Sequence, residues 1–492
     1  MEVPPRTPVL VGIGTATQRE DDPDRAAPPD SLMAEALRRA AADAGTPSLL
    51  EKADSVRVSR GFWNYPDPAR LVGDAVGATA AHTELFEIGV LQTSLFGSAA
   101  RDIAAGRAEI VLVAGGEAKH RAQRLKAAGR PEGLSRQAEG TAPGRVHRPH
   151  GEILSKIEIE NGLAMPVGAY AMADNALRAA EGQSLDAHRD DLAALWSAMS
   201  RVASKNPDAW SPEFKTPETI RDPGPRNRML CFPYTRLHNS QWNVDQAAGL
   251  IFTSADRARQ LGIPRDRWVF PLAVAEANAM LPLTNRKELH RSAGFRLAGE
   301  KALAQVGATA TDLDHVELYS CFPAAVRIQQ RELGLDPGAP TTVTGGMSFA
   351  GGPLNNFVLQ ATAKMAAVLR DDPASLGMVN AVSGLMTKQG VSLWSTEPRG
   401  EGFPYDDVSD ETEACVGRVE VVDDRPERAR IVSYTVAFEA EAPSTAILLC
   451  ERDDGRRVLV ALRDQDLALE LTRSEGCGRE VAFRGDDRAI LA

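Results

Sequence analysis

The segment Asp314-His-Val-Glu-Leu-Tyr-Ser-Cys-Phe-Pro-Ala-Ala-Val326 carries the sharpest change of pattern in this chain. Its apolar start predicts a buried strand from His315 to Leu318, which turns at residues 319–322 into a helix from about Pro323. Proline suits a first helical turn because its missing N–H would have no partner there. Corners of this kind lie at the carboxyl edge of a sheet, where α/β proteins place their chemistry.

Cys321 stands at this corner and has two interpretations. Its thiol could act as a thiolate or a proton donor, with its pKa lowered by the positive end of the helix. It could instead be a small buried core residue, as most free cysteines are.

Composition favours a globular protein that handles small molecules. The chain has 492 residues, 43% hydrophobic and 25% charged residues and a net charge of −11, which predicts two or three domains and argues against a nucleic-acid surface. No signal-peptide pattern follows Met1, and no apolar run reaches the roughly 20 residues of a membrane helix. The five cysteines fit no zinc spacing. We therefore expect a cytoplasmic protein with reduced thiols, no metal and no membrane partner.

The order of predicted elements occurs twice. The first series contains strands and helices at residues 8–14, 31–44, 53–58, 98–106 and 110–114, and the second at residues 268–275, 298–306, 315–318, 357–369 and 376–381. A repeated unit of this kind indicates two similar α/β halves, each with a mixed sheet and helices on its faces. Chance similarity of alanine-rich helices is the alternative.

Four regions follow from this pattern. The first α/β half comprises residues 1–118 plus part of 205–267, an inserted helical and loop domain covers 119–267, and the second half covers 268–396. The insertion begins with a basic run, Lys119 to Arg130, which either meets an anionic ligand such as a phosphorylated cofactor or is a solvated helix face. After a Pro/Gly/acidic linker, short β-patterned runs at 405–492 predict a small domain that is barrel-like or similar to an oligonucleotide-binding (OB) fold.

Several motifs together resemble the thiolase superfamily over residues 8–396. They are Gly115-Gly116-Glu117, the Tyr-Ser-Cys-Phe block at 319–322, Gly345-Gly346-Met-Ser-Phe-Ala-Gly-Gly-Pro353 and Ser383-Gly-Leu-Met-Thr-Lys-Gln389. The block at 319–322 is similar to that of the sterol-carrier-protein type of thiolase, and the added β domain is similar to that of thiolase-like proteins of type 1. The resemblance implies a duplicated fold of five αβαβα layers, coenzyme A thioesters as substrates and no tightly bound cofactor.

The chain also departs from the family's pattern. Thiolases use a nucleophilic Cys before the helix that here spans 98–106, yet no Cys precedes Cys231. Thr93 or Ser94 could substitute, although no neighbouring base is visible in the sequence. Gly352 stands where the family's Gly-His-Pro loop carries its His, and Tyr319 stands where the 319–322 block begins with His. Ordinary thiolysis through an acyl-enzyme is therefore not expected.

Three hypotheses remain. In the first, the protein forms or breaks a carbon–carbon bond of an acyl-CoA without an acyl-enzyme, as in retro-aldol or Claisen-type cleavage. Tyr319 and Cys321 would then move protons, and backbone N–H groups near Gly351 and Gly352 would polarise the thioester. His238 is the candidate base, unless it is a hydrogen-bonded loop histidine.

The same hypothesis places Ser383 and Gly384 beside the substrate. Lys388 would hold a carboxylate or phosphate, or else form a surface salt bridge. In the second hypothesis the chain is a catalytically degenerate subunit that binds a CoA ester or a partner protein. In the third, the C-terminal β domain is a binding module on a thiolase platform.

Oligomeric state is left as two alternatives. Thiolases commonly pair through the sheet edge of the first half, so a homodimer is the default expectation. The insertion or the extra domain could instead cover that edge and leave a monomer.

Overall fold

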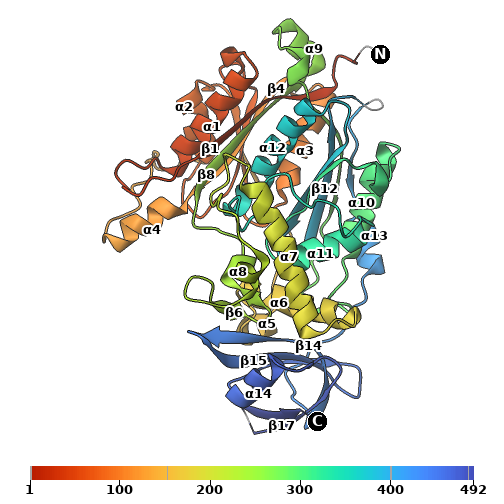
Figure 1. Ribbon diagram of the computed structural model, residues 1–492. Helices are drawn as coiled ribbons and strands as arrows, with labels where there is room; N and C mark the ends of the chain where they lie inside the picture. The colour runs from red at the N-terminus through yellow and green to blue at the C-terminus, as the bar shows by residue number, and fades with distance from the viewer. Residues whose placement is uncertain (1–2, 152, 399–401, 486, 492) are drawn as a thin grey trace.

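Two mixed β-sheets form the centre of the protein (Figure 1). The structure is a computed structural model that describes residues 3–151, 153–398, 402–485 and 487–491. The first sheet runs, in spatial order, β1 (Pro8–Thr17), β8 (Asp245–Ser254), β4 (Ile110–Ala118), β2 (Ser55–Ser59), β3 (His82–Phe86) and β5 (Arg145–His147). The second runs β10 (His315–Glu317), β11 (Gly377–Ser383), β12 (Lys388–Ser395), β9 (Phe270–Ala277) and β13 (Tyr405–Asp407).

Helices cover and separate the sheets in five layers. One outer layer contains α1 (Pro29–Asp43) and α2 (Pro68–Val76), and the middle layer contains α3 (Gln92–Ala104) and α12 (Phe357–Asp371). The other outer layer contains α10 (Ala293–Gln305), α11 (Pro323–Glu332) and the short α13 (Ser409–Cys415). The middle helices contact both sheets, which explains why most side chains of α12 are buried and most of the buried ones are apolar.

The predicted duplication is confirmed by strand pairing. β1 pairs antiparallel with β8, β8 pairs antiparallel with β4, and β4 pairs parallel with β2. The second half repeats this series with β9, β12, β11 and β10 in the same places. Chance similarity of helices does not produce the same sequence of pairing directions, so the five-layered fold class is correct.

The predicted corner at residues 314–326 is also confirmed. β10 ends at Glu317, and α11 begins at Pro323 after an extended Phe322 with φ −150° and ψ 159°. β9, β10 and β11 run in the same direction, so their carboxyl ends meet at one edge of the second sheet. Sequence patterns missed α2, β3 and β12, and they placed the starts of α3 and α10 five or six residues too late.

The insertion contributes strands to the first sheet and to the C-terminal sheet. It contains α4 (Lys119–Ala127), α5 (Lys156–Glu160), α6 (Pro166–Ala180), α7 (Leu185–Ala203), α8 (Pro217–Arg221), β6 (Met229–Cys231) and β7 (Tyr234–Thr235), and after β8 comes α9 (Ala255–Gln260). β8 completes the first sheet, and Cys231 of β6 pairs with Ala437 of the C-terminal sheet. β5 pairs with β3 and covers the edge strand of the first sheet, where His147 stacks on Phe86 at 3.9 Å.

The expected C-terminal β domain is present as an open sheet. Its elements are β14 (Arg428–Glu439), β15 (Ala442–Glu451), β16 (Arg457–Leu462), α14 (Gln465–Leu471), β17 (Glu480–Arg484) and β18 (Arg488–Leu491). The strand order is β16-β15-β14-β17-β18, and among the described residues β16 and β18 do not pair to close a barrel. The sheet packs on α6, where Ser433 Oγ donates to the Met172 carbonyl at 2.6 Å. Within the described ranges, no helix is both long and apolar enough to cross a membrane.

Candidate functional site

The corner after β10 is held in place by side chains from neighbouring elements. Gln329 of α11 accepts the Tyr319 N–H at 3.0 Å and donates to the Tyr319 carbonyl at 2.9 Å. Ser320 Oγ accepts the Met347 N–H at 3.0 Å, and the Ser240 N–H donates to the Cys321 carbonyl at 3.1 Å. These contacts fix the backbone on both sides of Cys321, which is what a positioned reactive group requires.

Cys321 is a buried, neutral thiol. Its side chain is 8% exposed, and Tyr170 of α6, which stacks on Phe322 at 4.6 Å, lies over it. Burial raises the pKa of the Cys321 thiol to about 12, and a hydrogen bond from Tyr170 offsets only part of that rise. The expectation of a pKa lowered by the helix end is therefore wrong: desolvation outweighs the helix dipole. Cys321 can donate a proton, but it is not a resting thiolate.

Tyr319 is a second buried hydroxyl beside Cys321. It is 9% exposed and packs edge-on against Phe357 at 5.9 Å. Burial, together with the proximity of Cys321, holds the pKa of Tyr319 well above its usual range. At neutral pH the corner therefore carries uncharged proton donors in apolar surroundings.

His238 does not fit the role of a general base. It belongs to a short 3-10 turn, Arg236–His238, in which its Nδ1 accepts the Thr235 N–H at 3.2 Å. Burial lowers the pKa of His238 to about 3, and among the described residues its Nε2 has no partner. Because the acceptor nitrogen is occupied by the turn, the imidazole is the hydrogen-bonded loop histidine of the alternative interpretation.

The Gly351-Gly352 segment is packed too closely to hold a histidine. A Cβ at Gly352 would lie 2.0 Å from Ser240 Oγ, and one at Gly351 (φ +103°) would lie 2.0 Å from Gln246 Oε1. The Gly352 N–H already donates to the Gln241 carbonyl at 2.8 Å. The expected use of this N–H to polarise a thioester is therefore corrected, because it has a protein partner.

A carboxylate lies beside the hydroxyls at the start of α3. Glu276 of β9 accepts hydrogen bonds from Thr93, from Ser94 at 2.9 Å and from Tyr405 at 3.0 Å. Burial raises the pKa of Glu276. This carboxylate was not visible in the sequence, because β9 and α3 are far apart in the chain; the structure places it beside Thr93 and Ser94. Because α3 belongs to the first half and β9 to the second, the hydrogen bonds from Thr93 and Ser94 to Glu276 join the two halves.

The last predicted loop is buried rather than exposed. Lys388 is 1% exposed, and its Nζ donates to the Gly89 carbonyl at 2.6 Å, so it does not form a surface salt bridge. Burial lowers the pKa of Lys388. Ser383 pairs with Lys388 across the β11–β12 turn, and a Cβ on Gly384 would lie 2.9 Å from Ile153 of the insertion. The insertion therefore closes over this loop.

The basic run that begins in α4 and extends to Arg130 forms ion pairs with acidic residues near the chain start. Arg124 contacts Asp21, and Arg130 forms an ion pair with Asp24 at 2.6 Å. Lys119 lies between the exposed rings of Phe62 and Trp242, 3.9 Å and 3.5 Å from their centroids. These contacts favour the solvated helix face over a phosphate site. No cluster of His, Cys, Asp and Glu suited to a metal ion occurs in the part of the chain that the structure describes.

Tertiary structure adds residues that the sequence did not point to. Tyr170 lies in an alanine-rich helix whose sequence is typical of a buried core helix. Ser240 and Glu276 come from segments without a recognisable motif. No local signal marks these residues, because their partners are brought together only by the packing of the insertion and the two halves.

Comparison with known proteins connects this arrangement with a family, although no protein-family model matches the chain. A crystal structure of a monomeric SCP2-thiolase like protein type 1 (STLP1) from Mycobacterium smegmatis is similar with a TM-score of 0.82 and 27% identity, covering 100% of both chains. An acetyl-CoA acetyltransferase from Methanothermobacter thermautotrophicus is 25% identical over 231 residues, 42% of this chain, and the match spans only 58% of that relative. The Ltp2-ChsH2(DUF35) aldolase shares the fold, with a TM-score of 0.61 and 19% identity over 80% of this chain and 99% of that one.

The duplicated five-layer fold and these similarities show that the chain belongs to the thiolase superfamily. Within that superfamily it has the architecture of SCP2-thiolase-like protein type 1, which it matches over its full length.

Proposed function

We propose that this protein binds an acyl-CoA thioester and forms or breaks a carbon–carbon bond beside the thioester, with Cys321 as the proton donor and without an acyl-enzyme. The observation that carries the proposal is the neutral, buried Cys321 thiol at the carboxyl edge of the second sheet, close to the Tyr170 hydroxyl. The relationship to an acetyl-CoA acetyltransferase and to thiolases supports a CoA ester as the substrate.

Retro-aldol chemistry suits this set of groups better than thiolysis. Claisen cleavage of a β-ketoacyl thioester needs a nucleophile that accepts the acyl group, and no Cys precedes Cys231 to supply a thiolate; the hydroxyls of Thr93 and Ser94 beside Glu276 are weaker nucleophiles and poorer leaving groups. Retro-aldol cleavage of a β-hydroxyacyl thioester needs only proton transfers. The α-carbon takes the Cys321 proton as the carbon–carbon bond breaks. The sulfur regains a proton through Tyr170 from the β-hydroxyl, which becomes the carbonyl of the second product.

The test is cleavage of β-hydroxyacyl-CoA esters in D2O by the full-length protein. We expect a shortened acyl-CoA that carries one deuterium at the α-carbon, detected by mass spectrometry. Cys321→Ala should abolish its formation, whereas Cys415→Ser, which changes an exposed thiol, should leave it unaltered. Undiminished cleavage by Cys321→Ala would refute the assignment of the proton donor.

A second candidate is a CoA-ester-binding or partner subunit without chemistry. It is favoured by the closure of the site, since Gly352 packs on Ser240 and Cys321 lies beneath Tyr170. This candidate predicts saturable binding of an acyl-CoA by calorimetry with no deuterium incorporation into any ester. The same two measurements therefore separate the two functions.

A further inference from the structure

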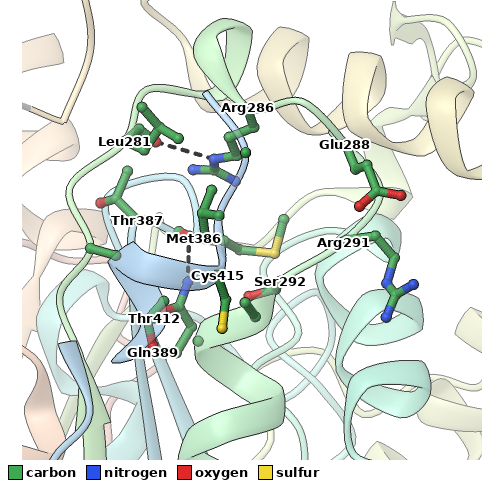
Figure 2. A pocket seen from close by; sticks show the side chains of 15 residues that line it. Leu281, Arg286, Glu288, Arg291, Ser292, Met386, Thr387, Gln389, Thr412 and Cys415 are labelled. Carbon is green, nitrogen blue, oxygen red and sulfur yellow. Dashed lines mark hydrogen bonds between the residues drawn. The ribbon is translucent and has the colours of Figure 1, made fainter. Parts of the chain in front are cut away.

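A small cavity of about 70 Å³ lies where three segments of the chain meet (Figure 2). The loop between β9 and α10 forms one wall, the β11–β12 turn forms another, and α13 forms the third. These segments come from the second half and from the region after the linker, so the cavity depends on the tertiary fold. It is far too small for coenzyme A.

Arg286 brings a buried positive charge to this cavity. It is 6% exposed, its Nε donates to the Leu281 carbonyl at 3.1 Å, and its Nη2 donates to the Leu385 carbonyl at 2.8 Å. Within the described residues Nη1 has no hydrogen-bond partner and no carboxylate contacts the guanidinium directly, although the buried Glu158 carboxylate interacts with it electrostatically from a greater distance. Burial lowers the pKa of Arg286 to about 10. Buried charges are ordinarily paired in direct contact, and in the described part of the chain this guanidinium has no contacting anion.

Three other polar side chains on the cavity wall also lack partners. They are Thr387, Gln389 and Thr412, which are 3%, 4% and 2% exposed. Oγ1 of each threonine and Oε1 of Gln389 make no hydrogen bond in the part of the chain that is described. Gln389 Nε2 donates to the Met386 carbonyl, which leaves Oε1 as the free acceptor (Figure 2). Single buried groups of this kind are uncommon, and a group of them on one cavity indicates a missing ligand.

The start of α10 adds a favourable field for an anion. Ser292 caps this 13-residue helix, and Ala293 and Gly294 of its first turn line the cavity. A Cβ at Gly294 would lie 2.0 Å from Gln389 Oε1, so glycine permits the close approach of the β11–β12 turn. Two charged residues lie farther out: Glu288 is exposed at the rim, and Arg291 is paired with Glu332 at 2.6 Å. The interior therefore keeps the charge of Arg286 and the helix end.

We propose that this cavity binds a small hydroxycarboxylate such as lactate. The carboxylate lies against Arg286 Nη1 and accepts from the hydroxyls of Thr387 and Thr412, and Gln389 Oε1 accepts from the ligand hydroxyl. Each buried group that lacks a partner thereby gains one, and the cavity volume limits the ligand to a few carbon atoms. The site does not depend on whether the protein turns over a thioester.

Calorimetry on the full-length protein with lactate, acetate and neutral lactamide tests the proposal. We expect saturable binding in the order lactate, then acetate, with none for lactamide. Thr412→Val, which removes a hydroxyl that has no protein partner, should weaken lactate binding about tenfold without lowering Tm. Thr311→Val, an exposed change elsewhere, should have no effect. Arg286→Lys should reduce lactate binding most. If the Arg286→Lys variant does not fold, the Thr412→Val variant still tests the proposal.

A second readout uses the exposed thiol of Cys415, which lines the same cavity. Saturating lactate should slow its alkylation by iodoacetamide, and lactamide should not. Equal effects of lactate and lactamide, no saturable binding of lactate, or unchanged affinity in Thr412→Val would each overturn the proposal.

Discussion

Gly352 provides the sharpest test of how the candidate site is packed. A methyl group at this position would lie 2.0 Å from Ser240 Oγ and 3.2 Å from Met347 Cε, whereas ordinary contacts begin near 3.4 Å. Overpacking of this kind costs about 1–3 kcal/mol. We therefore expect Gly352→Ala to lower the free energy of unfolding by about 2 kcal/mol. Gly352→His should cost more, because the ring also meets Met347.

A double-mutant cycle isolates the cause. In the described structure Ser240 Oγ makes no hydrogen bond, so Ser240→Ala alone should change stability by less than about 0.5 kcal/mol. In the double variant the new methyl group meets Ser240 Cβ at 3.3 Å in place of the hydroxyl at 2.0 Å. The two changes should then couple favourably by about 1.5 kcal/mol.

Urea unfolding of the four proteins at one pH measures the cycle, provided that the dependence on denaturant is the same for all four. Strictly additive effects would refute the reasoning, since they would show that Ser240 does not exclude a side chain at Gly352.

Four further outcomes follow from other parts of the structure. Burial raises the pKa of Glu117 from 4.5 to about 7, so between these pH values the folded state holds a proton that the unfolded state releases. The free energy of unfolding should therefore be highest below pH 4.5 and fall by about 3 kcal/mol as the pH rises through 7. Unfolding curves of Glu117→Gln should lack this loss. Arg457→Met removes donors to the carbonyls of Arg286 (2.5 Å) and Lys287 (2.8 Å) and should cost about 3 kcal/mol in urea unfolding, with an unchanged midpoint as the contrary result. Mass spectrometry after iodoacetamide treatment at pH 8 should find Cys415 modified long before Cys321, and comparable rates would contradict the buried thiol. Light scattering should give the mass of one 52.8 kDa chain, because β5 covers the edge of β3; a dimer joined along that edge would exclude this arrangement.

The fold class could be predicted from the sequence because its signals are local. The apolar run before Tyr319 and the proline at 323 define the corner without reference to the rest of the chain. The repeated order of elements defines the duplication in the same way. β12 was missed because Lys388 and Gln389 open it, and polar residues there read as a loop until the burial of the hairpin between the halves is known.

The same distinction between local sequence patterns and tertiary contacts applies to the candidate site. The sequence by itself determined that Cys321 lies at a strand-to-helix corner and that no cysteine precedes Cys231, because both statements concern order along the chain. Only the tertiary structure decided that the thiol is protonated, that Glu276 lies beside Ser94 and that Arg286 is buried with no contacting carboxylate among the described residues. The physical reason is that a pKa or an ion pair depends on desolvation and on neighbours brought together from distant segments, and a linear pattern contains neither.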